Sequence, residues 1–234
     1  MKSSWVEKLW SYLTGVQEEA DQTIVVGIGG GEVSGKNYLA AQLTSCAEGS
    51  IYHVITFPLD GYLRFSRDQR RELTGPGSPL KIRSLRIGDH PDNFDFQRLR
   101  KDLRGLLEDG YLNTPSQYDY TRGCVVHDLP PFHTADRTII LVEGIFALHS
   151  HLVDLYHVSI FLITDPQIVR QRYLKRHSDR GTGDEATILN KFHDVIKAYK
   201  AYIEPTRKNA QLVIPTGDTI GVEDMLLWQS EIKF

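Results

Sequence analysis

The feature of this sequence that most constrains its fold is a glycine-rich segment that closely follows an apolar run. The apolar run covers residues 23–27, and the segment from Gly30 to Lys36 fits the pattern G-x-x-x-x-G-K. Glycines at this spacing allow successive backbone N–H groups to point inward at a polyphosphate, and the lysine adds a positive charge. The sequence therefore predicts a P-loop between a buried strand and a helix, and with it the binding of a nucleoside triphosphate.

The predicted ligands of the triphosphate are the consecutive residues of this loop: Gly30, Gly31, Glu32, Val33, Ser34, Gly35, Lys36 and Asn37. A Ser or Thr normally follows the lysine and binds Mg²⁺ through its hydroxyl, but here the residue is Asn37. An amide oxygen can also bind Mg²⁺, although less well. A glycine-rich turn without a ligand is the alternative, and it is disfavoured because strand, loop and amphipathic helix occur in the required order.

Composition limits the classes of protein to which the chain can belong. A chain of 234 residues with 41% apolar residues can bury one sizeable core, so we expect a single domain over residues 1–234. A net charge of −3 gives no basic field of the kind that nucleic-acid binders use. Two cysteines without metal-type spacing favour a reducing compartment. No apolar stretch approaches the ~20 residues of a membrane span, and the first residues lack an apolar signal region. We expect a cytoplasmic protein that binds small molecules, not nucleic acid or membranes, and homo-oligomer formation is left open.

Apolar runs that alternate with helical spacing predict the fold class. Buried strands are expected at residues 23–27, 51–57, 138–142, 157–163 and 211–214. Helices are expected at residues 1–20, 94–110, 184–203 and 222–228. This order predicts an α/β fold, a P-loop NTPase-type parallel sheet with helices on both faces. The N-terminal helix has one apolar stripe, and we expect this stripe to cover the core, with partner binding as the alternative.

Two polar segments are predicted to lie near the ligands. Residues 61–95 form a long excursion rich in Gly, Pro and Arg, which suggests substrate contacts and not core. Residues 166–185 contain a basic helix that begins at Pro166 and carries Arg170, Arg172, Lys175, Arg176 and Arg180. Such a charge run usually marks a solvated face. Because it ends at the hinge-like segment 179–183, we expect a small helical lid that brings arginines onto phosphate.

Two acidic residues follow buried strands directly. Asp60 comes after the run 51–57, and Glu143 comes after the run 138–142. The carboxyl ends of parallel strands are where ligands bind in sheets of this kind, so we expect both acids to face the terminal phosphate. Asp60 suits the role of base or metal ligand, and Glu143 suits metal binding through water. The predicted metal ligands are therefore Asn37, Asp60 and Glu143, and the alternative for each acid is a helix cap or a solvated loop acid.

Taken together, these motifs resemble the uridine kinase and phosphoribulokinase family of P-loop kinases, and uridine kinase most. The resemblance runs in order from about residue 23 to residue 215. Its motifs are G-I-G-G through Lys36, D-G-Y at 60–62, D-H-P-D-N-F-D at 89–95, Y-D-Y-T at 118–121, V-E-G at 142–144, R-G at 180–181 and E-P-T-R-K at 204–208.

The resemblance implies roles for individual residues. Asp60 would be the catalytic base for a ribose 5′-hydroxyl, Asp89 would hold the 2′- and 3′-hydroxyls, and Tyr118 would line the nucleoside pocket. Lys36, Arg176 and Arg180 would complete the catalytic set with Asp60. The expected acceptor-binding residues are Asp60, Tyr62, Asp89, Tyr118 and Arg172.

The sequence also departs from the family pattern. The histidine that contacts the pyrimidine edge falls at Gly123, the aromatic residue before Asp89 falls at Gly88, and Thr182-Gly183 replace a second lid arginine. Our leading hypothesis is an ATP- and Mg²⁺-dependent kinase of a nucleoside such as uridine or cytidine. A kinase of another polyol (a sugar, sugar phosphate or glycerate) is the first alternative. A nucleotide-binding protein of kinase fold with lost turnover and a regulatory role is the second.

Overall fold

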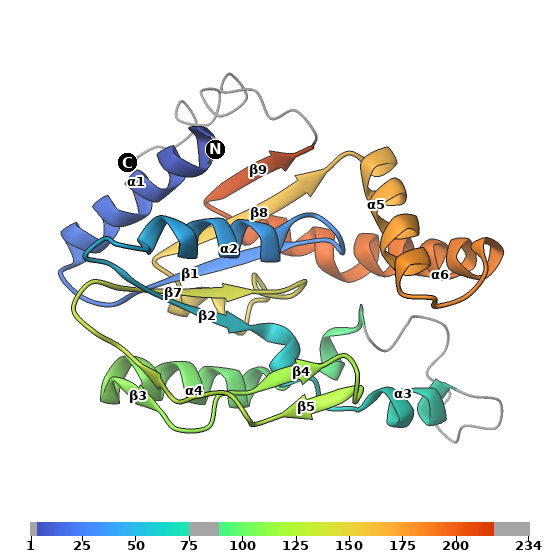
Figure 1. Ribbon diagram of the computed structural model, residues 1–234, viewed down its shortest axis with the longest axis horizontal. Coiled ribbons are helices and arrows are strands. Elements are labelled where there is room, and N and C mark those ends of the chain that lie inside the picture. Colours follow the sequence, from blue (N-terminus) through green and yellow to red (C-terminus); the bar gives the residue numbers. More distant parts are fainter. Residues whose placement is uncertain (1–3, 75–88, 218–234) are drawn as a thin grey trace.

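A computed structural model describes residues 4–74 and 89–217 of the chain. Its centre is a five-stranded parallel sheet with the strand order β2-β7-β1-β8-β9 (Figure 1). The strands are β1 (Ile24–Gly30), β2 (His53–Pro58), β7 (Thr138–Glu143), β8 (Val158–Thr164) and β9 (Leu212–Thr216). The predicted α/β parallel sheet is therefore confirmed. Gly88, the predicted helix 222–228 and much of the excursion 61–95 lie outside the described residues.

Helices cover both faces of this sheet. The helices are α1 (Ser4–Ala20), α2 (Lys36–Ala47), α3 (Arg67–Thr74), α4 (Phe96–Asp109), α5 (Pro166–Asp179) and α6 (Glu185–Ala198). The apolar sides of α1 and α2 pack with Ile24, Val26 and Ile28 of β1 into one core. The side chain of Val25 points to the opposite face, where it joins a second core that includes α4. Successive side chains of β1 thus point to opposite faces of the sheet, and each face has its own apolar core.

The carboxyl ends of the strands define one edge of the molecule. In Figure 1 the strands point toward the side on which α5 and α6 lie. The register pairs Pro58 of β2 with Glu143 of β7, and Ile28 of β1 with the same Glu143. The segments that follow β1, β2 and β7 therefore begin beside one another.

Several element boundaries differ from those predicted. The strand expected at 51–57 begins at His53, because Ile51 is 67% exposed and lies outside the sheet. The helix expected from residue 94 begins at Phe96, because the side chain of Asp95 caps it by accepting a hydrogen bond from the Arg98 N–H. The helix expected over 184–203 ends at Ala198. A π-helix at Tyr199–Ile203 and a 3₁₀-helix at Glu204–Asn209 follow it.

Two short antiparallel ribbons between residues 111 and 133 were not predicted. One pairs β3 (Tyr111–Leu112) with β6 (Phe132–His133), and the other pairs β4 (Gln117–Asp119) with β5 (Cys124–Val126). Strands of two or three residues are too short to show a period of two. Among the helices that the structure describes, none has the length and apolar character needed to cross a membrane.

Candidate active site

The predicted P-loop forms the connection from β1 to α2. Gly30 has a φ of +141°, and a Cβ there would lie 2.7 Å from the Leu162 carbonyl oxygen, so the position requires glycine. The Lys36 ammonium donates hydrogen bonds to the carbonyl oxygens of Gly30 (3.0 Å) and Gly31 (2.6 Å). Only 6% of this lysine is exposed, and burial lowers its pKa, against the opposing charges of Glu143 and Asp60. The lysine is thus held inside the loop by groups that phosphate oxygens can replace.

The two acids lie where the sequence placed them, at the ends of neighbouring strands. Glu143 is the last residue of β7, and Asp60 belongs to a 3₁₀-helix, Leu59–Tyr62, that follows β2 directly. Glu143 is 6% exposed, and burial raises its pKa to about 7, with a further increase from the charge of Asp60 and an opposing effect from Lys36. The P-loop lysine and both carboxylates therefore interact electrostatically.

The residues beside the loop have the chemistry of a Mg²⁺ site. The Asn37 amide nitrogen donates a hydrogen bond of 3.3 Å to the Glu143 carboxylate. This bond uses the amide nitrogen, so the oxygens of Asn37, Asp60 and Glu143 are the donors that fit a hard cation. No group of three or more His, Cys, Asp or Glu side chains within residues 4–74 and 89–217 could hold a metal. Mg²⁺ is usually held by one or two carboxylates together with substrate phosphates and water, and Asp60 and Glu143 are two carboxylates that could take this part.

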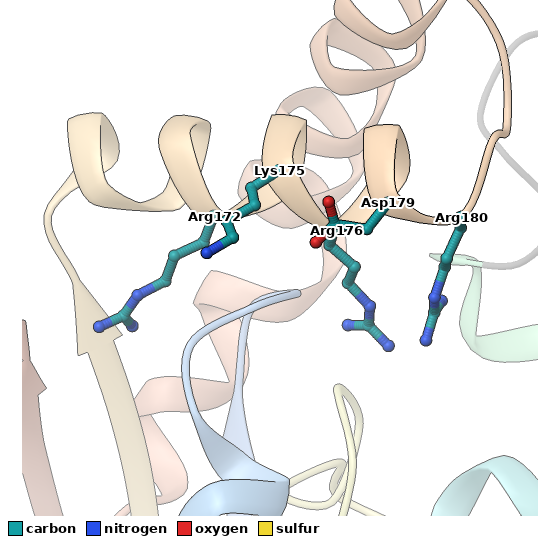
Figure 2. A pocket seen from close by; sticks show the side chains of 5 residues that line it. All are labelled: Arg172, Lys175, Arg176, Asp179 and Arg180. Carbon is teal, nitrogen blue, oxygen red and sulfur yellow. The ribbon is translucent and has the colours of Figure 1, made fainter.

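The basic helix α5 lies next to the P-loop (Figure 2). The Asp165 carboxylate caps α5 by accepting a hydrogen bond from the Gln167 N–H, and Pro166 occupies the first turn. An open pocket of about 350 Å³ is lined by Arg172, Lys175, Arg176, Asp179 and Arg180. Figure 2 shows Arg172, Arg176 and Arg180 extending from one side of α5, the side on which the P-loop lies. The pocket therefore offers several cations to an anionic group above the loop.

Apolar contacts join this basic helix to α6 and to the P-loop. Tyr173 of α5 packs with Ile188, Phe192 and Val195 of α6, and the loop residue Val33 packs against the same cluster. An Arg172 guanidinium N–H donates to the Val33 carbonyl oxygen at 3.5 Å. Arg172, which we predicted to bind the acceptor, thus lies on the triphosphate side of the site.

On the other side of Asp60, the β4–β5 ribbon presents two tyrosines. The rings of Tyr118 and Tyr120 meet edge to face at 5.1 Å, and the Tyr118 hydroxyl accepts a hydrogen bond of 2.7 Å from Arg70 of α3. The Tyr120 hydroxyl donates a hydrogen bond of 2.5 Å to the Asp60 carboxylate. We predicted Tyr118 for the acceptor side of the site but missed Tyr120. Tyr120 lies in the turn that follows β4, so the alternation of a strand could not have revealed it.

Tyr62 does not lie where a substrate contact requires. Its side chain is 1% exposed and stacks on Phe57 at a ring separation of 5.6 Å. Its hydroxyl donates a hydrogen bond of 3.0 Å to Asp102 of α4. Two residues after Asp60, the 3₁₀-helix turns this side chain into the second core. In this structure Tyr62 therefore belongs to the second core, and its predicted contact with the acceptor stays a prediction.

Asp89 is a buried acid on a backbone segment that is tied to the segment after Asp60. It is 5% exposed. Shortly after it, Leu63 and Phe94 form an isolated β-bridge, and the Asp95 N–H donates to the Tyr62 carbonyl oxygen at 2.8 Å. These bonds hold the D-H-P-D-N-F-D motif beside the chain that leaves Asp60.

Gly123, which falls where the family has a histidine, occupies the turn between β4 and β5. Its φ is +71°, and its N–H donates to the Asp119 carbonyl oxygen at 2.7 Å. A Cβ at this position would lie 2.9 Å from the Cβ of Arg67. The turn conformation and the close approach of α3 therefore require glycine here, and Arg67 lies where a larger side chain would extend.

The fold and the site together define a P-loop kinase. The P-loop follows the central strand of a parallel sheet, acids stand at the ends of two neighbouring strands, and a basic helix lies across the loop. The model of the phosphoribulokinase / uridine kinase family matches residues 25–223. The chain belongs to this family.

The relatives agree with this assignment, and the solved structures agree with the fold. The chain is 31% identical to a uridine kinase of Staphylococcus haemolyticus over 198 residues, which is 83% of this chain and 88% of the relative. It is 29% identical to a mouse uridine-cytidine kinase-like 1 over 88% of this chain and 36% of the relative. Among solved structures, a possible uridine kinase from Bacillus stearothermophilus matches with a TM-score of 0.58 at 20% identity, over 89% and 98% of the two chains. A D-glycerate 3-kinase from Cryptococcus neoformans matches with a TM-score of 0.60 at 12% identity, over 85% and 88%. At these identities the structures show the fold alone.

Proposed function

We propose that the protein transfers a phosphoryl group from ATP to the 5′-hydroxyl of a nucleoside such as uridine or cytidine. The observation that carries this proposal is the aromatic pair Tyr118 and Tyr120 beside the Asp60 carboxylate. Two tyrosine rings suit a flat base, and a carboxylate next to them suits a hydroxyl that must lose a proton. Two relatives that are 28% and 31% identical to this chain are uridine kinases, which supports a nucleoside as the acceptor.

Each part of the site has a role in this proposal. The backbone N–H groups of the P-loop and Lys36 would hold the triphosphate, while Arg176 and Arg180 would neutralise charge on the transferred group. Asn37, Asp60 and Glu143 would hold Mg²⁺, directly or through water, and the ion would supply charge neutralisation at the phosphates. Asp60 would accept the proton of the acceptor hydroxyl.

The buried acid Asp89 would bind the ribose. A carboxylate can accept a hydrogen bond from each hydroxyl of a vicinal diol. Because Asp89 is 5% exposed, its contacts with a diol would be largely shielded from water, which strengthens them. This role predicts that Asp89→Ala weakens acceptor binding more than any change at Gly123.

A second candidate acceptor is a sugar phosphate or glycerate, and the arginines of α3 favour it. Arg70 donates to the Tyr118 hydroxyl, with its guanidinium 5.5 Å from the ring centroid, and Arg67 lies against Gly123. Cations on the acceptor side suit an acceptor that carries a negative charge. A regulatory protein without turnover is the third candidate. The Asn37–Glu143 hydrogen bond favours it, because an amide replaces the usual hydroxyl ligand.

An ATP-consumption screen separates these candidates. We would measure ADP formation with Mg²⁺ and nucleosides, sugars, sugar phosphates and hydroxy acids as acceptors. The proposal expects turnover with uridine and cytidine, and less than about tenfold discrimination between them, since Gly123 offers no side chain to a base. Efficient turnover of a charged sugar or hydroxy acid alone would favour the second candidate, and ATP binding without turnover would favour the third.

The assignment of the base is tested by Asp60→Asn, which keeps the shape of the side chain but removes the proton acceptor. We expect kcat to fall by roughly 10²–10⁴ with little change in ATP affinity. Near-normal kcat in this variant would rule out Asp60 as the base.

A further inference from the structure

Tyr120 contacts both sides of the site. Its hydroxyl donates a hydrogen bond of 2.5 Å to the Asp60 carboxylate, and the Arg180 guanidinium lies 5.3 Å from the centroid of its ring. Arg180 is the residue that ends α5, and it extends next to Arg176 in the basic pocket (Figure 2). One side chain thus joins the acceptor-side acid to the helix that covers the P-loop.

The turn that carries Tyr120 is fixed by several hydrogen bonds. The Asp119 carboxylate accepts from the N–H groups of Thr121 (2.7 Å) and Arg122 (3.0 Å), and the Arg67 side chain donates to the Tyr120 carbonyl oxygen. Despite this rigid backbone, the Tyr120 side chain is 51% exposed. Although it is exposed, Tyr120 has two partners at the site: its hydroxyl contacts Asp60, and the face of its ring contacts Arg180.

We propose that Tyr120 is a positioning residue that aligns Asp60 through its hydroxyl and Arg180 through its ring. This inference rests on the proposed role of Asp60 as the base. Asp60 stands on a short 3₁₀-helix, and a hydrogen bond to one carboxylate oxygen restricts rotation of the group, so that the other oxygen can face an acceptor hydroxyl. A hydrogen bond to a charged acceptor is stronger than one between neutral groups, which suits this task.

The ring has a separate task. A guanidinium over the face of a tyrosine is attracted by the negative charge of the π-system. Arg180 would otherwise be a flexible side chain at the end of a helix, and ordering it before phosphoryl transfer reduces the entropy that must be lost during the reaction. Tyr120 would therefore order a base and a cation that act on opposite ends of the transferred group.

Two variants separate the hydroxyl from the ring. Tyr120→Phe removes only the contact with Asp60, while Tyr120→Leu removes both contacts. Tyr111→Phe is the matched control. Tyr111 belongs to the other ribbon, at β3, and it is also an exposed tyrosine (41%). Its hydroxyl also donates a hydrogen bond to a side chain, that of Asn113. Turnover is measured with uridine and MgATP for each variant, for Asp60→Asn, and for the double variant Asp60→Asn/Tyr120→Phe.

We expect Tyr120→Phe to lower kcat roughly tenfold, about 1.4 kcal/mol, with the KM for ATP unchanged. Tyr111→Phe should retain the wild-type kcat. In the Asp60→Asn background the loss of the Tyr120 hydroxyl should have no further effect, because the group through which it acts is already gone. A merely structural role would instead give additive losses in the two backgrounds.

The contact with Arg180 is measured without an acceptor. Trypsin cleaves after arginine, and Arg180-Gly181 lies in the exposed segment that follows α5. We expect Tyr120→Leu to be cleaved several times faster than wild type at this bond, as mapped by mass spectrometry, and Tyr120→Phe to be cleaved at the wild-type rate. Equal rates in all three proteins would overturn the role of the ring.

The outcomes also separate this inference from the proposed function. If Asp60→Asn loses activity while Tyr120→Phe keeps the wild-type kcat, the role of the hydroxyl is overturned and the base assignment stands. If Asp60→Asn keeps its activity, both the base assignment and the role of the hydroxyl fail. If uridine is not turned over, the nucleoside assignment fails, and the trypsin measurement still decides whether Tyr120 holds Arg180.

Discussion

At the scale of single residues, the position of a side chain could be predicted from the sequence where a local pattern determines it. The positions of Lys36, Asp60 and Glu143 could be predicted because each follows directly from a local pattern: a glycine-spaced loop or the end of an apolar strand. Tyr62 is buried in the second core although it is only two residues from Asp60. The direction of a side chain in a 3₁₀-helix depends on what packs beneath it, here Phe57 and Asp102, and neither residue is near Tyr62 in a sequence pattern.

The raised pKa of Glu143 predicts a pH dependence of stability. Burial raises this pKa from 4.5 to about 7, so the folded protein binds the proton more tightly than the unfolded chain. The free energy of unfolding should therefore decrease as the pH rises from about 4.5 to about 7, by up to about 3 kcal/mol from this group. Glu143→Gln should lack that decrease. Denaturant unfolding of both proteins at pH 5 and pH 8, in the absence of nucleotide and metal, measures the difference, and parallel pH dependences would contradict the prediction.

Asn37 allows a prediction about the metal. Its amide nitrogen donates to Glu143, and only its oxygen remains for Mg²⁺. Because a threonine hydroxyl is the better ligand at this position, Asn37→Thr should lower the Mg²⁺ concentration for half-maximal turnover several-fold and raise kcat. Asn37→Ala, which removes both contacts, is the control and should do the opposite. Loss of a robust wild-type activity in Asn37→Thr would show that the site is adapted to the amide.

At the level of elements, the long strands and helices were predictable and the connections were not. Thr138–Glu143 is buried along its whole length, and its residues 139–142 are all apolar before the acid that ends it. The ribbon β4–β5 depends instead on contacts between segments: Arg67 of α3 donates its backbone N–H to the Gly123 carbonyl oxygen at 2.6 Å. A contact of this kind produces no periodic pattern of apolar residues in the sequence of either segment. The sequence could therefore identify Gly123 as a departure from the family but could not show that a turn requires it.

Two glycine substitutions should have opposite effects on stability. Gly123→Ala places a Cβ 2.9 Å from the Cβ of Arg67 at a φ of +71°, so we expect a loss of about 1 kcal/mol or more. Gly105 lies inside α4, and its added Cβ would be in ordinary van der Waals contact, 3.9 Å from an Asp109 carboxylate oxygen. Gly105→Ala should stabilise the protein by about 0.5–1 kcal/mol, because alanine favours the helix. Thermal unfolding of the two variants tests both signs, and two changes of the same sign would contradict this account.

Across the whole molecule, the site is assembled from segments that are distant in the sequence. The P-loop, the two acids, the tyrosine ribbon and α5 come from separate connections at one edge of the sheet (Figure 1). The family resemblance predicted which of these segments contribute. It could not predict the Tyr120–Asp60 or Asn37–Glu143 hydrogen bonds, since these depend on how the connections meet.

The buried charge of Lys36 gives a prediction for the whole protein. Burial disfavours the charge of Lys36, and the loop carbonyls and the charges of Glu143 and Asp60 offset only part of that cost, so Lys36→Ala should not lower the melting temperature of the free protein. In wild type, MgATP at 100 times its Kd should add about 2.7 kcal/mol to the free energy of unfolding, and Lys36→Ala should lose this gain. The exposed Lys101→Ala on α4 is the control. A full stabilisation by MgATP in Lys36→Ala would show that the lysine does not bind the triphosphate.

The π-helix at Tyr199–Ile203 has a consequence for how the chain can change in length. A π-turn contains one residue more than an α-turn, so this segment absorbs an extra residue between α6 and β9. Tyr199 packs against the P-loop at Gly31, and the ring of Tyr202 meets that of His90 at 4.6 Å, which fixes the segment at both ends. Deleting one residue here would restore a continuous α-helix. Every side chain of α6 would then rotate by about 100° about the helix axis, and Ile188, Phe192 and Val195 would leave their contacts with Tyr173.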